Sequence, residues 1–446
     1  MLAEYARKYK GKKVGFVGLG VSNTPILEMM IKAGAVCSVR DMKELRIEDA
    51  YAALEKDGVT FVCGDRYLDQ IDENYLFLSP AVRDDLPALQ KAKENGTVLT
   101  NEMEEFFALC PCPIIGITGS DGKTTTTTLI SKLLEAEGKR VHLGGNIGRN
   151  LLCELDNVTE SDVAVVELSS FQLMKMTHSP HIAVITNMSP NHLNWHVDME
   201  EYVSAKENIF RFQKKDDILI LNKDDGYANR CAKKAASRMK FTSGKGHGCV
   251  WFDETGIYRG EMLVVRDEEI RLVGIHNRYN YAQAICAVEG MVSDENICKV
   301  AREFGGVEHR CEFVREKDGV KFYNSSIDSS PTRTAACVGS FKTPLVVICG
   351  GYDKNIPLEP LGELFPGRVK HAVLCGATSE KIASVLDAVG YTEYTLVTDF
   401  EEAVKLASSK AVAGDAVVLS PAAASFDMFK NFAVRGETFK RIVNAL

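Results

Sequence analysis

The stretch Ile114-Ile115-Gly116-Ile117-Thr118-Gly119-Ser120-Asp121-Gly122-Lys123-Thr124-Thr125 decides the fold of this chain. An apolar strand runs into a glycine turn, and a helical pattern follows. Backbone N–H groups at the start of a helix attract an anion, and glycines let the backbone approach it closely. Lys123 can reach the β- and γ-phosphates of a nucleotide, and the Thr124 hydroxyl can bind Mg²⁺. The stretch therefore predicts a phosphate-binding loop between a buried strand and a helix.

This loop is a shorter variant of the common one. A generic Walker A loop has glycine at the position of Ile117, so the chain carries the form Thr-Gly-x-x-Gly-Lys-Thr. A tight strand-to-helix turn without a ligand is the alternative interpretation. The sequence Gly-Lys-Thr directly after a strand argues against it.

Length and composition bound the class of protein. At 446 residues the chain has room for three domains of about 150 residues each. The net charge of −8 argues against a nucleic-acid partner. No apolar run approaches the ~20 residues that cross a bilayer, and the first residues lack the apolar core of a signal peptide. The 13 cysteines contain no Cys-x-x-Cys pair. We therefore expect a cytoplasmic protein with reduced, mostly buried thiols.

Strand-then-helix patterns repeat along the whole chain, which predicts an α/β fold of parallel sheets covered by helices. We expect three domains: a Rossmann-like domain over 1–101, a central P-loop ATPase-type parallel sheet over 102–306, and a Rossmann-like α/β domain over 307–446. The first opens with the glycine turn Gly18-Leu19-Gly20, and Asp41 stands at the tip of its second strand. Asp41 can bind a ribose or simply face solvent. Asn23 replaces the third glycine of a dinucleotide fingerprint, which argues against a redox dinucleotide.

Three further side chains of the central block are candidates for metal chemistry. Glu167 ends an apolar strand in the sheet that carries the phosphate loop, where a second Mg²⁺-binding group is needed. His192 and His196 follow the next strand, and either can bind metal or only form hydrogen bonds. Lys206 lies in a predicted helix, where a lysine ordinarily faces solvent.

Several motifs occur in a fixed order along the chain: Gly119 to Thr124, Gly144-Gly145-Asn146-Ile147-Gly148, Glu167-Leu168-Ser169-Ser170-Phe171-Gln172-Leu173, Asn187 to His192, Ala205-Lys206, Gly274-Ile275-His276-Asn277 and His309-Arg310. This is the order found in Mur ligases, and the chain resembles that family over essentially its whole length. Two more, Gly350 to Lys354 and Leu419 to Phe432, resemble the family members that add D-glutamate.

The resemblance implies an ATP-dependent amide ligase. ATP would phosphorylate the carboxylate of UDP-N-acetylmuramoyl-L-alanine, and the amine of D-glutamate would attack the acyl phosphate. Two Mg²⁺ ions and Lys123 would neutralise the charge that builds up when the two anions meet. The resemblance also implies a bacterial cytoplasmic enzyme, which we expect to be a monomer.

The resemblance assigns roles to individual residues. The catalytic group would be Lys123, Glu167, His192 and Lys206. Thr124 and Glu167 would hold one Mg²⁺, and His192 with a carbamylated Lys206 the other, since a carbamate offers carboxylate-like oxygens and needs a neutral amine. ATP would contact Gly119, Ser120, Asp121, Gly122, Lys123, Thr124, Thr125, Asn277, Asn280, Arg310, Ser325 and Asp328. The UDP substrate would contact Ser22, Asp41, Ser79 and Asn146, and D-glutamate would contact Lys354, Ser425 and Phe432.

One departure bears on ATP. Where the family has Asn-Asp-Ser, this chain has Asn324-Ser325-Ser326, and Asp328 follows three residues later. We expect Asp328 to take the place of the missing carboxylate.

Two alternatives share the phosphate loop. Another Mur ligase, or an enzyme like folylpolyglutamate synthetase, would differ in its amino-acid pocket. A P-loop switch protein would need neither Lys354 nor Ser425.

Overall fold

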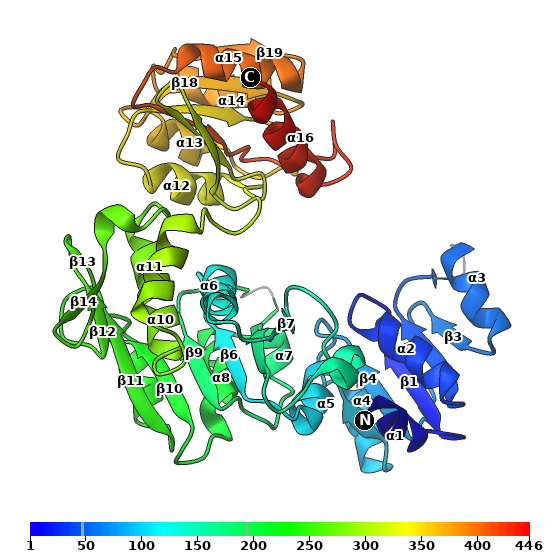
Figure 1. Ribbon diagram of the computed structural model, residues 1–446. Helices are drawn as coiled ribbons and strands as arrows, with labels where there is room; N and C mark the ends of the chain where they lie inside the picture. Colours follow the sequence, from blue (N-terminus) through cyan, green and yellow to red (C-terminus); the bar gives the residue numbers. More distant parts are fainter. Residues whose placement is uncertain (46–48, 193–194) are drawn as a thin grey trace. The chain divides into compact units, whose positions relative to one another are not determined.

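The computed structural model describes residues 1–45, 49–192 and 195–446, and it contains three separate β-sheets (Figure 1). The chain divides into two compact units. The first comprises residues 1–264 and 279–297 and holds the N-terminal sheet and nearly all of the central sheet. The second comprises residues 265–278 and 298–446 and holds the C-terminal sheet.

The first sheet has five parallel strands in the order β3-β2-β1-β4-β5. This order reverses direction at β1, as in doubly wound nucleotide-binding folds, and it confirms the Rossmann-like prediction. Phe16 and Phe77 stack at the centre of its core with ring centroids 5.4 Å apart. The strands are β1 (Lys13–Val17), β2 (Val36–Asp41), β3 (Thr60–Cys63), β4 (Tyr75–Leu78) and β5 (Val98–Thr100), and the helices are α1 (Leu2–Arg7), α2 (Asn23–Lys32), α3 (Asp49–Lys56) and α4 (Pro87–Glu94).

The central sheet has nine strands in the order β14-β13-β12-β11-β10-β9-β6-β8-β7. Among the described residues, the seven neighbouring strands β7, β8, β6, β9, β10, β11 and β12 form a parallel array, as predicted. The strands are β6 (Ile114–Thr118), β7 (Val141–Gly145), β8 (Val163–Glu167), β9 (Ile182–Ile185), β10 (Ile218–Asn222), β11 (Arg238–Ser243), β12 (Val250–Phe252), β13 (Gly256–Arg259) and β14 (Met262–Arg266).

The structure adds an antiparallel extension to this sheet. Strands β12 and β13 pair antiparallel, with Val250 opposite Arg259. Only three residues, 253–255, separate them. Such a short connection cannot cross over to a parallel neighbour, so the chain turns back on itself.

The helices of the central region follow the strands. Helix α6 (Lys123–Ala136) directly follows the phosphate loop, and α8 (Met199–Arg211) confirms the helix predicted around Lys206. The others are α5 (Glu102–Leu109), α7 (Ser170–Leu173), α9 (Ala228–Ala232), α10 (Ile275–Ala287), α11 (Asp294–Glu303) and the 3₁₀ helices η2 (Leu152–Asn157) and η3 (Asp267–Glu269).

The third sheet has the order β15-β16-β20-β17-β18-β19, and its strands are parallel except for the β15–β16 hairpin. Alternate residues of β17 pack on opposite faces: Val347 packs with α12, α13 and α14, and Val346 with α15 and α16. The strands are β15 (Glu312–Lys317), β16 (Val320–Asn324), β17 (Leu345–Cys349), β18 (Val369–Cys375), β19 (Tyr394–Val397) and β20 (Ala416–Leu419). The helices are α12 (Pro331–Gly339), α13 (Glu359–Leu364), α14 (Ser379–Ala388), α15 (Phe400–Lys410) and α16 (Phe432–Ala445).

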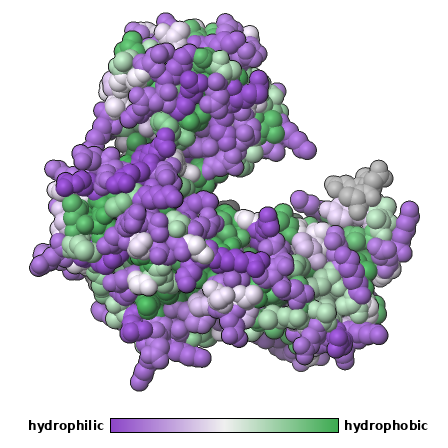
Figure 2. Space-filling model, in the orientation of Figure 1, coloured by the Kyte–Doolittle hydropathy of each residue, from purple (hydrophilic) through white to green (hydrophobic). Residues whose placement is uncertain are grey.

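All thirteen cysteines are free thiols, and Cys249 is the only one that is exposed. Hydrophilic residues cover most of the face shown in Figure 2. Among the described residues, no helix is both long and apolar enough to cross a membrane.

Candidate active site

The phosphate loop joins β6 to α6 at the carboxyl end of the central sheet. Neighbouring segments fix its backbone: the Ser120 N–H donates to Asn187 O at 2.9 Å, and the Asp121 N–H to Asn187 Oδ1 at 3.0 Å. The Thr186 hydroxyl donates to Asp121 O at 2.6 Å. The Asp121 side chain is exposed, and the loop is held through its backbone.

Two glycines of the loop have no room for a side chain. Gly119 has φ 147°, and a Cβ there would lie 1.9 Å from Thr186 Oγ1. Gly122, the N-cap of α6, has φ 79°, and a Cβ there would lie 2.3 Å from Asn280 Oδ1. The close approach and the positive φ both require glycine, which leaves the backbone open to a phosphate.

Lys123 is the first residue of α6, and its side chain folds back over the loop. Its Nζ donates to Gly119 O at 3.0 Å and to Ser120 O at 2.8 Å. The ammonium group therefore lies beside the cradle that the loop forms.

Glu167 ends β8, next to β6 in the sheet, and is 1 % exposed. Its Oε1 accepts a hydrogen bond from Asn146 Nδ2 at 2.7 Å. Its Oε2 is buried and has no hydrogen-bond partner among the residues that the structure describes. A buried carboxylate oxygen without a donor is unfavourable unless a cation binds it, so this atom fits a metal ligand.

Lys206 projects from α8 to the same place and is 2 % exposed. Its Nζ donates to Gly119 O at 2.8 Å and to Thr118 Oγ1 at 3.2 Å. Burial, and then the charge of Lys123, lower the pKa of Lys206 well below its usual value. The solvent-facing interpretation of this lysine is therefore wrong, because its side chain is buried. The buried environment favours the neutral amine.

The two histidines of the next loop have different environments. His192 is exposed overall and has φ 55°. Partial desolvation of its ring, and then the nearby charge of Lys123, lower its pKa. His196 is buried, and its two ring nitrogens contact Ser170 Oγ at 2.9 Å and Glu201 Oε2 at 3.2 Å. Because both nitrogens of His196 are engaged, His192 is the better placed to bind a metal.

The remaining predicted residues of the central region lie around the start of α6. Thr124 and Thr125 occupy its first turn. Asn280, on α10, is buried, and its Oδ1 accepts from Thr126 Oγ1 at 3.3 Å. The structure thus brings Asn280 to the loop, as the ATP prediction requires.

The predicted UDP contacts of the first sheet surround its glycine turn. Asp41 accepts hydrogen bonds from the N–H groups of Leu19 at 3.0 Å and Lys43 at 2.9 Å. A Cβ on Gly18 would lie 2.6 Å from Ser79 Oγ. Ser22 is the N-cap residue of α2, and its carbonyl accepts from Asn150 Nδ2 at 2.7 Å.

Asn23 fills the place of the third glycine. Its Nδ2 donates to Gly18 O at 2.8 Å and to Phe77 O at 3.3 Å, and the residue is 1 % exposed. The Asn23 side chain ties the turn to β4. A dinucleotide fingerprint has glycine at this position, which leaves the start of the helix unobstructed.

Four predicted ATP contacts belong to the second compact unit. Arg310 is exposed, and Asn277 donates from Nδ2 to Val273 O at 2.7 Å. Ser325 is buried, and its Oγ accepts from the Cys311 N–H at 3.0 Å. Asp328 is 6 % exposed and accepts from Ser420 Oγ at 2.8 Å. Burial raises the pKa of Asp328.

The three predicted D-glutamate contacts lie in two segments that touch. The Tyr352 N–H donates to Ala424 O at 2.9 Å, which joins the loop of Lys354 to that of Ser425. Lys354 is exposed, Ser425 is 2 % exposed, and Phe432 is 40 % exposed at the start of α16. A cation, a hydroxyl and an aromatic ring thus occur on neighbouring segments.

Buried Arg435 supports these segments, and the sequence gives no sign of this role. Its guanidinium donates to Ala423 O, Ala424 O and Ser326 O at 2.9–3.1 Å. Burial lowers its pKa to about 10.

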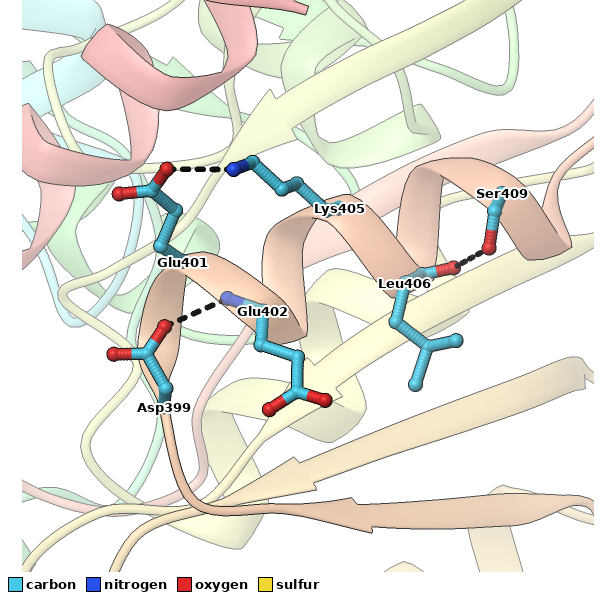
Figure 3. Close-up of a pocket in the computed structure, with 6 residues that line it drawn as sticks. All are labelled: Asp399, Glu401, Glu402, Lys405, Leu406 and Ser409. Atoms are coloured by element: carbon cyan, nitrogen blue, oxygen red, sulfur yellow. Dashed lines mark hydrogen bonds and ion pairs between the residues drawn. The ribbon is translucent and has the colours of Figure 1, made fainter.

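Two other groupings are weaker candidates. Glu308, His309 and Glu437 bring three possible metal ligands together, but Lys440 Nζ lies 2.7 Å from both carboxylates and forms an ion-pair cluster with them. Figure 3 shows a recess on α15 in which Glu401 pairs with Lys405 and Asp399 caps the helix at the Glu402 N–H. Its polar groups interact mainly along one helix, so it is not the active site.

Sequence reasoning missed a set of contacts between the first sheet and the central region. Arg83 pairs with Glu201, and Lys175 donates to Ser79 O and Pro80 O. The hydrogen bonds of Arg83 lower the pKa of Glu201 to about 2. An arginine and a lysine in loops give no signal of such pairing in one sequence.

Two family models match most of the chain. The Mur ligase middle domain matches residues 117–288, and the Mur ligase glutamate ligase domain matches residues 309–423. The first match contains the phosphate loop, Glu167 and Lys206.

Relatives and solved structures agree with this result. A UDP-N-acetylmuramoylalanine–D-glutamate ligase of Clostridium botulinum strain Hall is 46 % identical over 98 % of this chain and 97 % of its own length. The enzyme of the same name from Clostridium novyi strain NT is 45 % identical over 99 % of both chains.

MurF from Acinetobacter baumannii has TM-score 0.61 at 16 % identity, covering 100 % of this chain and 98 % of its own. UDP-N-acetylmuramate-alanine ligase from Thermotoga maritima has TM-score 0.59 at 17 % identity, covering 97 % and 99 %. These two structures support the fold. The family models and the near-full-length identity to the clostridial enzymes show that this chain belongs to the Mur ligase family.

Proposed function

We propose that this protein is an ATP-dependent ligase that joins D-glutamate to UDP-N-acetylmuramoyl-L-alanine in peptidoglycan precursor synthesis. The observation that carries the proposal is the 46 % identity, over nearly the full length, to relatives named for this reaction. The site agrees with it, because a phosphate loop, a buried carboxylate with an unpartnered oxygen and a buried lysine meet at one end of the central sheet.

The proposed division of labour follows the three predicted domains, 1–101, 102–306 and 307–446. The first would bind the UDP substrate through Ser22, Asp41 and Ser79, and Asn146 would contact it from the central domain. The third would bind D-glutamate through Lys354, Ser425 and Phe432. The central domain would bind ATP.

In the proposed reaction, the alanyl carboxylate attacks the γ-phosphorus of ATP, and ADP leaves. The amine of D-glutamate then attacks the acyl carbon and forms the C–N bond, the nitrogen releases a proton, and phosphate departs as its C–O bond to the acyl carbon breaks. Two anions must meet in the first step, so positive charge at the loop is the main requirement. Lys123 supplies it at a position fixed by Gly119 O and Ser120 O.

The family uses ATP and Mg²⁺, and the residues here fit the ion. The unpartnered Glu167 Oε2 offers a buried anionic oxygen, and Thr124 offers a hydroxyl in the first turn of α6. Magnesium would supply charge neutralisation at the phosphates and the approaching carboxylate. We propose Thr124 and Glu167 as ligands of one ion, and His192 and Lys206 as ligands of the other.

Lys206 would serve as a ligand in carbamylated form. Its neutral amine attacks the carbon of CO₂, one C=O electron pair moves to oxygen, and the nitrogen releases a proton. The burial that lowers the pKa of Lys206 supports this step because it favours the free amine. The product would carry an anionic oxygen where the ammonium group is unfavourable.

Phosphate release tests the proposal. Turnover should require UDP-N-acetylmuramoyl-L-alanine and D-glutamate together, and the product should gain the mass of one glutamyl residue. L-Glutamate, L-lysine and diaminopimelate replace D-glutamate in parallel assays. Release without the acceptor would indicate a switch protein or simple NTPase, and a preference for another amino acid would indicate a different ligase. Gel filtration tests the expected monomer.

A further inference from the structure

The loop after β4 is held from outside its own sheet. Lys175 Nζ donates to Ser79 O at 2.8 Å and to Pro80 O at 3.0 Å. Trp195 Nε1 donates to Ala81 O at 3.2 Å. Three successive carbonyls of the loop therefore accept hydrogen bonds from side chains of the central region, within one compact unit.

Arg83, in the same loop, makes the reciprocal contacts. Its guanidinium donates to Trp195 O at 3.1 Å and to the two Glu201 carboxylate oxygens at 2.7 and 3.1 Å. It also lies over the Trp195 ring, 5.0 Å from the centroid, and pairs with Asp85. The planar guanidinium thus fixes both a backbone carbonyl and a carboxylate, which an ammonium group cannot do with the same geometry.

These contacts reach the segment that carries two proposed metal ligands. The N–H groups of Trp195 and His196 both donate to His192 O at 3.0 Å. Glu201 lies in the first turn of α8, where Asp198 caps its N–H at 2.8 Å, and the same helix carries Lys206. Arg83 therefore contacts the helix of Lys206 directly, through Glu201, and is one contact away from the backbone of His192.

We propose that Arg83 is a positioning residue that couples the UDP-substrate loop to the second metal site. Binding of the UDP substrate against residues 79–81 would tighten the loop, and Arg83 would hold Trp195 and the start of α8 so that His192 and Lys206 are aligned. This inference rests on the proposed function, because it takes Ser79 as a substrate contact and His192 and Lys206 as metal ligands.

Exposure explains why the contacts matter more than an ordinary surface ion pair. Arg83 and Glu201 are 21 % and 23 % exposed, whereas Arg66 and Asp69, in the same domain, are 83 % and 52 % exposed. Ion pairs between exposed side chains contribute little to the stability of a protein. Arg66→Ala is therefore a matched control that removes an arginine and one ion pair without touching the central region.

The first experiment separates kinetic constants. Arg83→Ala should raise the Mg²⁺ concentration for half-maximal activity and the KM for UDP-N-acetylmuramoyl-L-alanine about tenfold each, and leave the KM for D-glutamate within twofold. Arg83→Lys should fall between the parent and Arg83→Ala. Arg66→Ala should match the parent.

The second experiment reads the coupling without turnover. The chain has two tryptophans, and Trp251 stacks on Tyr258 in the β12–β13 hairpin. In Trp251→Phe, Trp195 is the only tryptophan. Titration with UDP-N-acetylmuramoyl-L-alanine, in EDTA and without ATP, should change its emission, and the change should be lost when Arg83→Ala is added.

The outcomes distinguish this inference from the proposed function. If the parent neither binds nor uses the UDP substrate, both are wrong. If it turns over normally but the Trp195 emission stays constant at saturation, or if Arg83→Ala behaves like Arg66→Ala, only the coupling is wrong. Should Arg83→Ala fail to fold, Arg83→Lys and Glu201→Gln are tested in its place, and normal Mg²⁺ dependence in both overturns the inference.

Discussion

Replacing Glu167 by glutamine should abolish activity and yet stabilise the metal-free protein. No described residue forms a hydrogen bond with the buried Oε2. Lys206 compensates the carboxylate charge only weakly, because burial lowers the pKa of Lys206. An unsatisfied buried polar group costs about 1–3 kcal/mol and a charged one more, so exchanging the carboxylate oxygen for a neutral amide nitrogen removes the excess cost of the charge. Glutamine keeps the Oε1 that accepts from Asn146 and removes the unpaired charge. For a chain of this length, a gain of about 1 kcal/mol corresponds to a rise in Tm of roughly 1–2 °C.

Activity should change in the opposite direction. Loss of one preorganised electrostatic group costs about 3 kcal/mol in the transition state, or roughly 100-fold in rate. Mg²⁺ with a non-hydrolysable ATP analogue should raise the Tm of the parent and should fail to do so in Glu167→Gln.

Calorimetry in EDTA and phosphate release measure the two effects. Glu160→Gln makes the same chemical change at an exposed position before β8 and should alter neither quantity. A metal-free Tm several degrees below that of the parent would show that Glu167 already has a compensating partner. If Glu167→Gln turned over like the parent, the assignment of Glu167 as a metal ligand would be wrong.

Four other substitutions test the site and its surroundings. Lys123→Ala should lower turnover roughly 100-fold, whereas Lys132→Ala on the exposed side of α6 should not, and near-normal turnover of Lys123→Ala would contradict the phosphate-loop assignment. Lys206→Ala should be nearly inactive and partly restored by short carboxylic acids, and ¹³C-bicarbonate should give a carbamate signal in the parent that Lys206→Ala lacks. Burial raises the pKa of Glu102 from 4.5 to about 7, so the unfolding free energy of the parent falls as pH rises from 4.5 to 7 and the buried carboxyl group ionises. Glu102→Gln should match the parent near pH 4 and exceed its unfolding free energy by roughly 3 kcal/mol at pH 8, as urea unfolding would measure. Asp328→Asn should raise the KM for ATP several-fold without changing the D-glutamate dependence, and if neither this variant nor Ser325→Asp alters the KM for ATP, the loop does not contact the nucleotide.

The sequence predicts the parallel sheets well because local patterns determine them. The apolar run before Gly119 can only be a buried strand, and Gly-Lys-Thr after it begins a helix. The position of Glu167 was also predictable, because the apolar run before it forms β8 beside β6 and ends at this residue; its role as a Mg²⁺ ligand stays a prediction.

Other parts depend on contacts between distant residues, which one sequence does not reveal. A lysine at position 206 has the pattern of a solvent-facing residue, and only the packing of α8 against β6 buries it. The contact of Arg83 with Glu201 joins residues 118 positions apart. The β12–β13 hairpin escaped prediction because its strands are only three and four residues long.

The distribution of thiols has a chemical consequence. Burial raises the pKa of Cys37, Cys231 and Cys286 to about 12, so at neutral pH these groups are almost entirely protonated and poor nucleophiles. Cys249, at the start of the β12–β13 hairpin, is the one exposed thiol. In the native protein a maleimide dye should therefore react with Cys249, on the extension of the central sheet, faster than with these buried thiols.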